Sequence, residues 1–225
     1  MTPELTNLIF VVAAIVFAVL LELRPGKKKP MQIKMADPAE YIYPHPEPPE
    51  KLQAILQQVP GTGELLYHYT ERNNITKSAK YWALEMLEKG FETSGVIQLA
   101  GEDLDMDPLA YSALLGTIFR ELGFEVQPEV ANCAYAASIA EEVLQGQRTV
   151  REGFGVLNAA AISSGYDIVF NDFYFAKDYV ENLVPWPDEE DPRKPERMDG
   201  WMRRYFEAFL AANPKYRSTA TAAQN

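Results

Sequence analysis

Cysteine and histidine are almost absent from this sequence of 225 residues, and their scarcity excludes several kinds of site. Cys133 is the one cysteine, so the chain can form neither an internal disulfide nor a multi-cysteine metal site. The two histidines, His45 and His68, are too far apart in sequence to form a pair with metal-ligand spacing. A Ser-His-Asp triad would have to use one of them. His45 falls in a proline-rich stretch, a poor place for a rigid site, and we predict that His68 is a partly buried polar residue.

The motifs for phosphate and calcium are also incomplete. Gly61-Thr62-Gly63 and Gly153-Phe154-Gly155 are each a lone GxG without the third glycine or the lysine of a phosphate loop, so we interpret both as helix ends or close helix packing. Aspartates alternate over residues 103–107 as at the start of a calcium loop. Pro108 and Leu114, however, stand where that loop needs glycine and glutamate. We therefore predict no catalytic residue, no metal and no cofactor.

Positive charge is scarce beyond the first part of the chain. The formal net charge is -11, and because residues 1–30 carry +2, the remainder carries -13. Nucleic-acid binding rests on lysine and arginine contacts to phosphates, so this charge excludes nucleic acid as a partner.

An apolar segment stands at the N-terminus. Residues 5–21 contain no charge, and as a helix they would extend about 26 Å, the short end of what spans a bilayer. A cleaved signal peptide would need basic residues before the apolar run, and a core helix would not usually be apolar on every face. Residues 1–7 contain no lysine or arginine, whereas four basic residues follow the run. We predict a single transmembrane anchor over residues 1–24.

The basic residues after the anchor predict its orientation. By the positive-inside rule they stay in the cytoplasm, which leaves the N-terminus outside and the rest of the chain at the cytoplasmic face of a bacterial inner membrane. Two interpretations of this cluster stay open, a topology signal alone or an additional contact with anionic lipid headgroups. The predicted membrane-interface residues are Arg24, Lys27, Lys28 and Lys29.

Proline and helix periodicity divide the rest of the chain. Residues 25–49 begin basic and continue proline-rich, which predicts an extended tether, and its Tyr41, Ile42 and Tyr43 are apolar enough to dock on the domain. Residues 50–213 predict an acidic helical domain, and residues 214–225 a disordered tail.

Apolar spacing, caps and glycine stops predict an all-α fold. Asp107-Pro108 and the Thr149/Glu152 capping box are the strongest helix starts, and Asn171 or Asp172 is the expected cap of an aromatic-rich helix ending at residue 183. A small strand is possible only near residues 166–170. The expected helices cover about residues 50–59, 64–69, 78–88, 94–99, 108–122, 128–145, 150–162, 172–183 and 200–212.

Residues 77–125 contain an alanine- and leucine-rich segment ending in EKG, a short LAG segment and an amphipathic segment ending in ELG. Residues 140–160 continue with a glycine and a capping threonine, and an acidic loop precedes the last helix. In these features residues 77–212 resemble small bacterial all-helical proteins, most of them uncharacterised and some immunity-like. The resemblance implies an all-helical domain and, for some members, neutralisation of a toxin. It implies no catalytic residues.

Three functions remain open: a membrane-anchored interaction protein or accessory subunit of a membrane complex, an immunity-like protein that neutralises a toxin, and an enzyme with an unrecognised site. We favour the first, because aromatic side chains anchor interfaces and a strongly acidic domain suits a basic protein partner. The candidate partner-binding residues are the rings of Phe173, Tyr174 and Tyr179 and the acidic loop residues Asp188, Glu189, Glu190 and Asp191.

Overall fold

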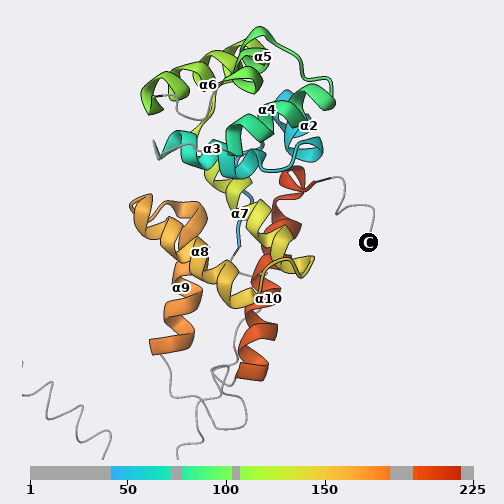
Figure 1. Cartoon of the computed structure of the whole chain (residues 1–225). Helices are drawn as coiled ribbons and strands as arrows, with labels where there is room; N and C mark the ends of the chain where they lie inside the picture. The colour runs from blue at the N-terminus through green and yellow to red at the C-terminus, as the bar shows by residue number, and fades with distance from the viewer. Residues whose placement is uncertain (1–41, 72–77, 103–106, 183–194, 219–225) are drawn as a thin grey trace, which may run out of the picture. The chain divides into compact units, whose positions relative to one another are not determined.

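The computed structural model describes residues 42–71, 78–102, 107–182 and 195–218, except for the side chains of 176–182 and 195–196. These ranges contain helices and irregular segments but no strand, which confirms the all-α prediction for them (Figure 1). None of the helices described there is long and apolar enough to cross a membrane. The predicted anchor, its basic residues and residues 25–41 of the tether lie outside the described ranges.

The helices follow one another with short connections. They are α2 (Glu50–Gln58), α3 (Thr62–Thr70), α4 (Ser78–Glu88), α5 (Ser94–Gly101), α6 (Pro108–Leu122), α7 (Pro128–Leu144), α8 (Val150–Ser163), α9 (Ile168–Asn182) and α10 (Pro195–Ala212), followed by the 3-10 turn η2 (Pro214–Tyr216). Helix α7 packs against α3, α8, α9 and α10, whereas α5 packs between α4 and α6 (Figure 1).

Local hydrogen bonds explain why several predicted boundaries are confirmed. Asp107 Oδ1 accepts from Leu109 N at 2.7 Å, and Pro108 occupies the first turn of α6. Thr149 and Glu152 form the predicted reciprocal capping box at the start of α8. These side chains satisfy backbone N–H groups that have no partner inside the helix.

The stretch 166–170, the predicted place for a strand, instead contains the start of α9. Asp167 Oδ1 accepts from Val169 N at 3.0 Å and caps the helix, and Val169 is fully buried. The prediction that Asn171 or Asp172 caps this helix is therefore wrong, because both lie inside it. Helix α10 also begins earlier than predicted, at Pro195 rather than after Asp199.

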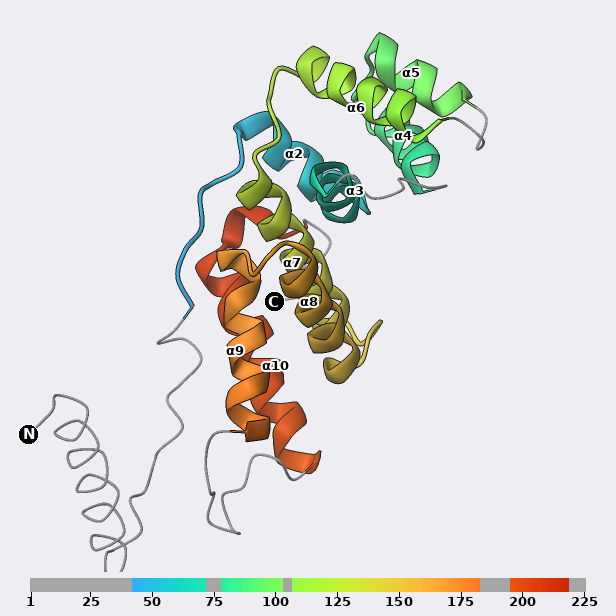
Figure 2. The ribbon, with the colours of Figure 1, turned by 90° about the vertical axis from the view of Figure 1, so that its left-hand side faces the viewer.

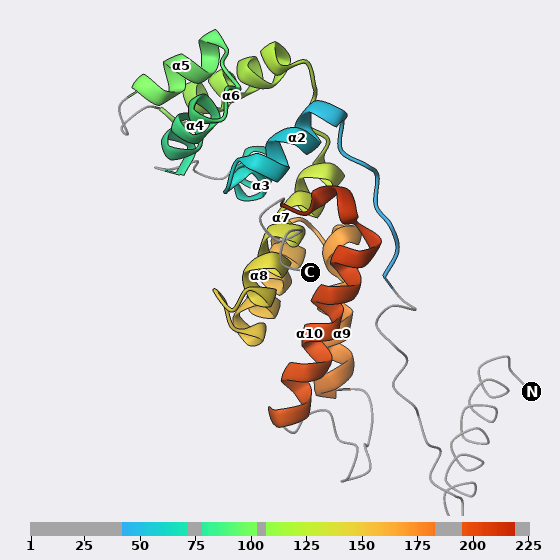
Figure 3. The same ribbon diagram turned by 90° about the vertical axis from the view of Figure 1, so that its right-hand side faces the viewer.

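Both ends of the predicted domain are longer than expected. Ile42 is buried, and Figures 2 and 3 show residues 42–49 running along α9 and α10 to the start of α2. Tyr43 is exposed, so of the predicted docking residues within the described ranges only Ile42 docks. At the other end, residues 214–218 are ordered and Tyr216 is buried, which corrects the predicted disorder for these residues.

Two glycines allow α3 to approach its neighbours, as the interpretation of the GxG motifs predicts. Gly61 has a φ of 75° and forms the tight turn between α2 and α3. A Cβ atom at Gly63 would lie 2.4 Å from the backbone oxygen of Ala134, so only glycine lets α3 cross α7 this closely.

Candidate functional site

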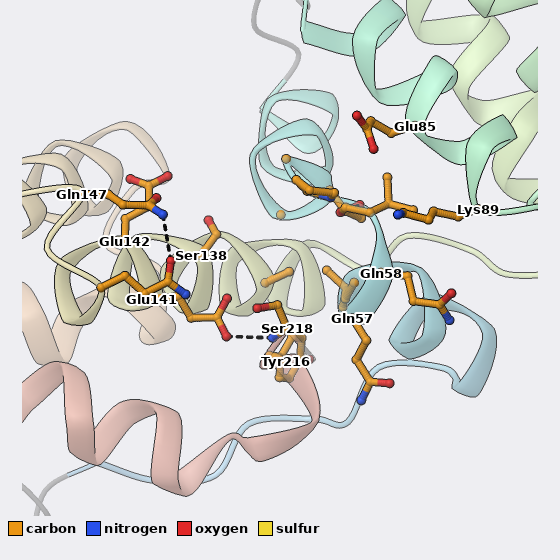
Figure 4. A pocket seen from close by; sticks show the side chains of 18 residues that line it. Gln57, Gln58, Glu85, Lys89, Ser138, Glu141, Glu142, Gln147, Tyr216 and Ser218 are labelled. Carbon is orange, nitrogen blue, oxygen red and sulfur yellow. Dashed lines mark hydrogen bonds between the residues drawn. The ribbon is translucent and has the colours of Figure 1, made fainter. Parts of the chain in front are cut away.

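A cleft of about 670 Å³ lies where the α2–α3 turn, the end of α4, helix α7 and the C-terminal segment meet (Figure 4). Gln57 and Gln58 line it from α2, Glu85 and Lys89 from the end of α4, and Ser218 from the C-terminal segment. Helix α7 contributes a polar stripe to the same cleft. That stripe consists of Ser138, Glu141, Glu142 and Gln145.

Hydrogen bonds of Thr62 hold the α2–α3 turn in place beside the cleft. Its buried hydroxyl donates to Val59 O at 2.7 Å and accepts from Trp82 Nε1 at 2.9 Å. The turn is thereby joined to α4, while Gly63 joins it to α7. These contacts make the wall of the cleft a rigid part of the core, as a binding site requires.

The charge of the cleft is negative. Glu141 is 9 % exposed, and its Oε1 accepts from the backbone N of Ser218 at 2.7 Å. Within the described part of the chain, no lysine, arginine or histidine pairs with this carboxylate. Glu142 is neutralised by Arg148, whose Nη2 lies 2.7 Å from Glu142 Oε2. A buried carboxylate without a cation is costly, so Glu141 is the group for which a ligand would compensate most.

The remaining polar groups of the cleft favour binding over catalysis. Gln147 Nε2 donates to Gln145 Oε1 at 2.9 Å, which presents amide donors and acceptors at the rim (Figure 4). The Ser138 hydroxyl donates to the backbone carbonyl of Tyr135 at 2.8 Å rather than to a base. Among the described lining residues there is no histidine or cysteine. The cleft therefore offers hydrogen bonds and negative charge, but no activated nucleophile.

A second hollow of about 800 Å³ lies beside α6, lined by apolar groups such as Leu109 and Phe119. Arg120 also lines it, but its Nε donates to Gly116 O at 3.1 Å and its Nη2 to Thr117 Oγ1 at 3.0 Å. No charged lining residue of this hollow is classed as buried in the described ranges. The cleft beside Glu141 is thus the better candidate.

The aromatic residues predicted as partner contacts separate in the structure. Phe173 is fully buried against rings of α8 and α10, so this candidate is wrong, because it cannot meet a partner while the domain is folded. Tyr174 is half-buried and packs edge-on against Tyr166 at 5.1 Å and Phe175 at 5.7 Å. Tyr179 belongs to α9, but its side chain is outside the described part, as are residues 188–191 of the acidic loop.

Sequence reasoning missed the cleft, although one signal for it exists. In the alanine-rich helix α7, residues 138, 141 and 145 are polar at positions i, i+3 and i+7, the spacing of one helix face. That face continues the buried side of the helix, since Glu141 is buried while its neighbour Glu142 is not. A polar stripe on an otherwise small and apolar helix is the pattern that indicates a lined cavity.

The two histidines have different outcomes. His68 is partly buried, as predicted, with its Nε2 3.8 Å from Glu64 Oε1. His45 does not belong to a loose tether: its side chain is 6 % exposed, and its Nδ1 lies 3.4 Å from Glu129 Oε1. No cluster of histidine, cysteine and carboxylate side chains that could hold a metal occurs among the described residues.

Asp172 on α9 lies close enough to His45 to feel its charge, and it provides a test of this buried region. Burial raises the pKa of Asp172 from 3.8 to about 6, and His45 opposes that rise. Because the folded pKa exceeds the unfolded one, the ionised carboxylate destabilises the fold fully above about pH 6 and not at all below about pH 4. We expect Asp172→Asn to raise the free energy of unfolding by about 1 kcal/mol at alkaline pH, after allowance for solvent screening.

Denaturant unfolding at two pH values measures this effect. The gain should almost vanish in acid, where the aspartate is already protonated. An equal gain at both pH values would show that ionisation is not its cause.

Comparison of the chain with protein-family models, with curated proteins and with solved structures found no match. The function must therefore be inferred from the geometry of the chain itself.

Proposed function

We propose that this chain is a non-enzymatic, membrane-anchored interaction protein, an accessory subunit of a membrane complex. Its helical domain binds a basic segment of a partner protein in the cleft between α2, α4 and α7. The observation that carries this proposal is Glu141, a carboxylate that is 9 % exposed, lines the cleft and has no cationic partner in the described part of the chain.

The chemistry of the ligand follows from this carboxylate. Taking an ion out of water costs several kcal/mol, and a lysine or arginine side chain in hydrogen-bonding range offsets that cost. Glu85 adds a second carboxylate at the same cleft, where Lys89 is the one cation among the lining residues. The glutamine amides at the rim can hydrogen-bond the backbone of a bound peptide. A lysine- or arginine-bearing segment fits this combination.

The charge of the whole domain supports the same class of partner. A net charge of -13 beyond residue 30 attracts a basic partner over distance, raises its association rate and makes that rate fall with added salt. The apolar run of residues 5–21 and the basic residues after it support an anchor that places the domain at the cytoplasmic face of the inner membrane. Anionic headgroups remain a proposed contact of those basic residues.

An immunity-like role is the second candidate, favoured by the resemblance of residues 77–212 to small helical proteins. A basic toxin would use the same acidic cleft. The two roles differ in the partner: an accessory subunit remains with a membrane complex in mild detergent, whereas an immunity protein binds a toxin and abolishes its activity.

Binding of defined peptides to the purified full-length protein tests the proposal. We expect a peptide rich in lysine and arginine to bind, and a peptide with glutamine at those positions not to bind. Glu141→Gln keeps the size and the acceptor oxygen but removes the charge, so it should weaken binding about tenfold, or about 1.4 kcal/mol. Isothermal titration calorimetry in mild detergent measures both affinities.

The matched control is Glu92→Gln, which removes one charge from an exposed position outside the cleft. It should change the affinity by less than about twofold, because an exposed charge contributes mainly to long-range attraction. Equal binding of the basic and neutral peptides, or an equal effect of the two substitutions, would refute the cleft as the binding site.

A further inference from the structure

The turn that follows α10 is bonded to the proline-rich segment 42–49. The backbone N of His45 donates to Asn213 Oδ1 at 2.9 Å, and the Tyr216 hydroxyl donates to Pro46 O. Lys215 forms an ion pair with Glu47. The His45 ring packs on Phe209, with ring centroids 6.0 Å apart. Three consecutive segment residues are therefore held by residues 213–216.

The same turn forms one wall of the cleft. Tyr216 and Ser218 both line it, and the backbone N of Ser218 donates to Glu141 Oε1 (Figure 4). Tyr216 thus contacts the segment through its hydroxyl while its residue borders the cleft. The contacts with segment 42–49 and with Glu141 lie within six residues of one another in sequence, positions 213–218.

The turn between these contacts is held by its own hydrogen bonds. Tyr216 N donates to Asn213 O at 3.2 Å, and Arg217 N donates to Pro214 O at 3.3 Å. The buried Asn213 side chain also donates through Nδ2 to Phe209 O at 3.0 Å. A short turn with so many bonds moves as one piece, so a displacement at the segment reaches Ser218.

We propose that docking of segment 42–49 and binding of a basic ligand in the cleft are positively coupled through the turn 213–218. The coupling rests on the proposed function for its ligand. When the segment is docked, Tyr216 and Ser218 are held in the positions that complete the cleft around Glu141. When it is released, the buried Tyr216 hydroxyl loses Pro46 as its acceptor and the wall must be ordered again at the ligand's expense. Because coupling free energies are reciprocal, a bound ligand strengthens segment docking by the same factor.

The substitution His45→Ala tests this coupling from the segment side, because His45 does not line the cleft. It removes a ring that is 6 % exposed and weakens segment docking. We expect the affinity for the basic peptide to fall about three- to tenfold. Tyr43→Ala is the control, because Tyr43 lies in the same segment but is 68 % exposed, and it should leave the affinity within about twofold.

Hydrogen exchange of the full-length protein gives a second measurement that needs no ligand. In His45→Ala the Ser218 amide, which is bonded to Glu141, should exchange faster than in the wild type. In the wild type, added basic peptide should slow exchange of the His45 amide, which is bonded to Asn213. If His45→Ala does not fold, Tyr216→Phe replaces it, since it removes only the hydroxyl that donates to Pro46.

The outcomes separate the two proposals. If the wild type binds no basic peptide, the proposed function is wrong, and exchange at Ser218 alone decides whether the turn couples the two regions. If His45→Ala accelerates exchange only in residues 42–49 and leaves both the Ser218 amide and the peptide affinity unchanged, the coupling is refuted.

Discussion

Replacing Phe173 with alanine is expected to lower the free energy of unfolding by about 3–5 kcal/mol. Phe173 is fully buried, and its ring contacts Phe154 on α8 and two rings of α10, Phe206 and Phe209, with centroids 5.4–5.6 Å away. Removing the ring leaves a cavity among side chains from three helices. The shortened side chain loses both its transfer free energy and its ring contacts.

Phe175 provides the matched control for this substitution. It lies two positions further along α9 and is 61 % exposed, so Phe175→Ala should change stability by less than about 0.5 kcal/mol. Denaturant unfolding of the full-length protein, followed by circular dichroism, measures both variants. If the two substitutions cost the same, the described orientation of α9 against α10 is incorrect.

Replacing Gly63 with alanine is expected to separate α3 from α7 and to cost about 3 kcal/mol. The added Cβ would meet the backbone of α7, 2.4 Å from Ala134 O and 2.8 Å from Ala134 C. A side chain could rotate away from such a clash, but backbone atoms inside a helix cannot. Because the α2–α3 turn borders the cleft, the same substitution should also weaken binding of the basic peptide.

Gly155→Ala is the control for the second substitution. It lies inside α8 and is exposed, and no atom lies within 4 Å of a Cβ built there. Alanine should therefore stabilise this helix by about 0.5–1 kcal/mol, since it loses less backbone entropy than glycine on folding. Thermal unfolding of the two variants should show shifts of opposite sign. A destabilisation of equal size at both positions would contradict the close approach at Gly63.

Local sequence was sufficient to predict most helix boundaries, because the groups that form them are close in the chain. Asp107 and the amide it caps are two positions apart, and Thr149 and Glu152 are three apart. The start of α9 was missed for a local reason as well. The run 168–170 is β-branched and aromatic, a composition typical of strands, and the cap at Asp167 was not recognised.

Which residues form the core and which form the cleft was decided by tertiary structure. Phe173 and Phe175 have the same side chain on the same helix, and only the position of α10 makes one buried and the other exposed. The cleft depends on a bond between Glu141 and Ser218, 77 positions apart, and the segment is held by a bond between His45 and Asn213, 168 positions apart. Sequence periodicity extends over a few helical turns, so it determines the helices of this protein, whereas the pairing of groups so distant in the chain is determined by how those helices pack.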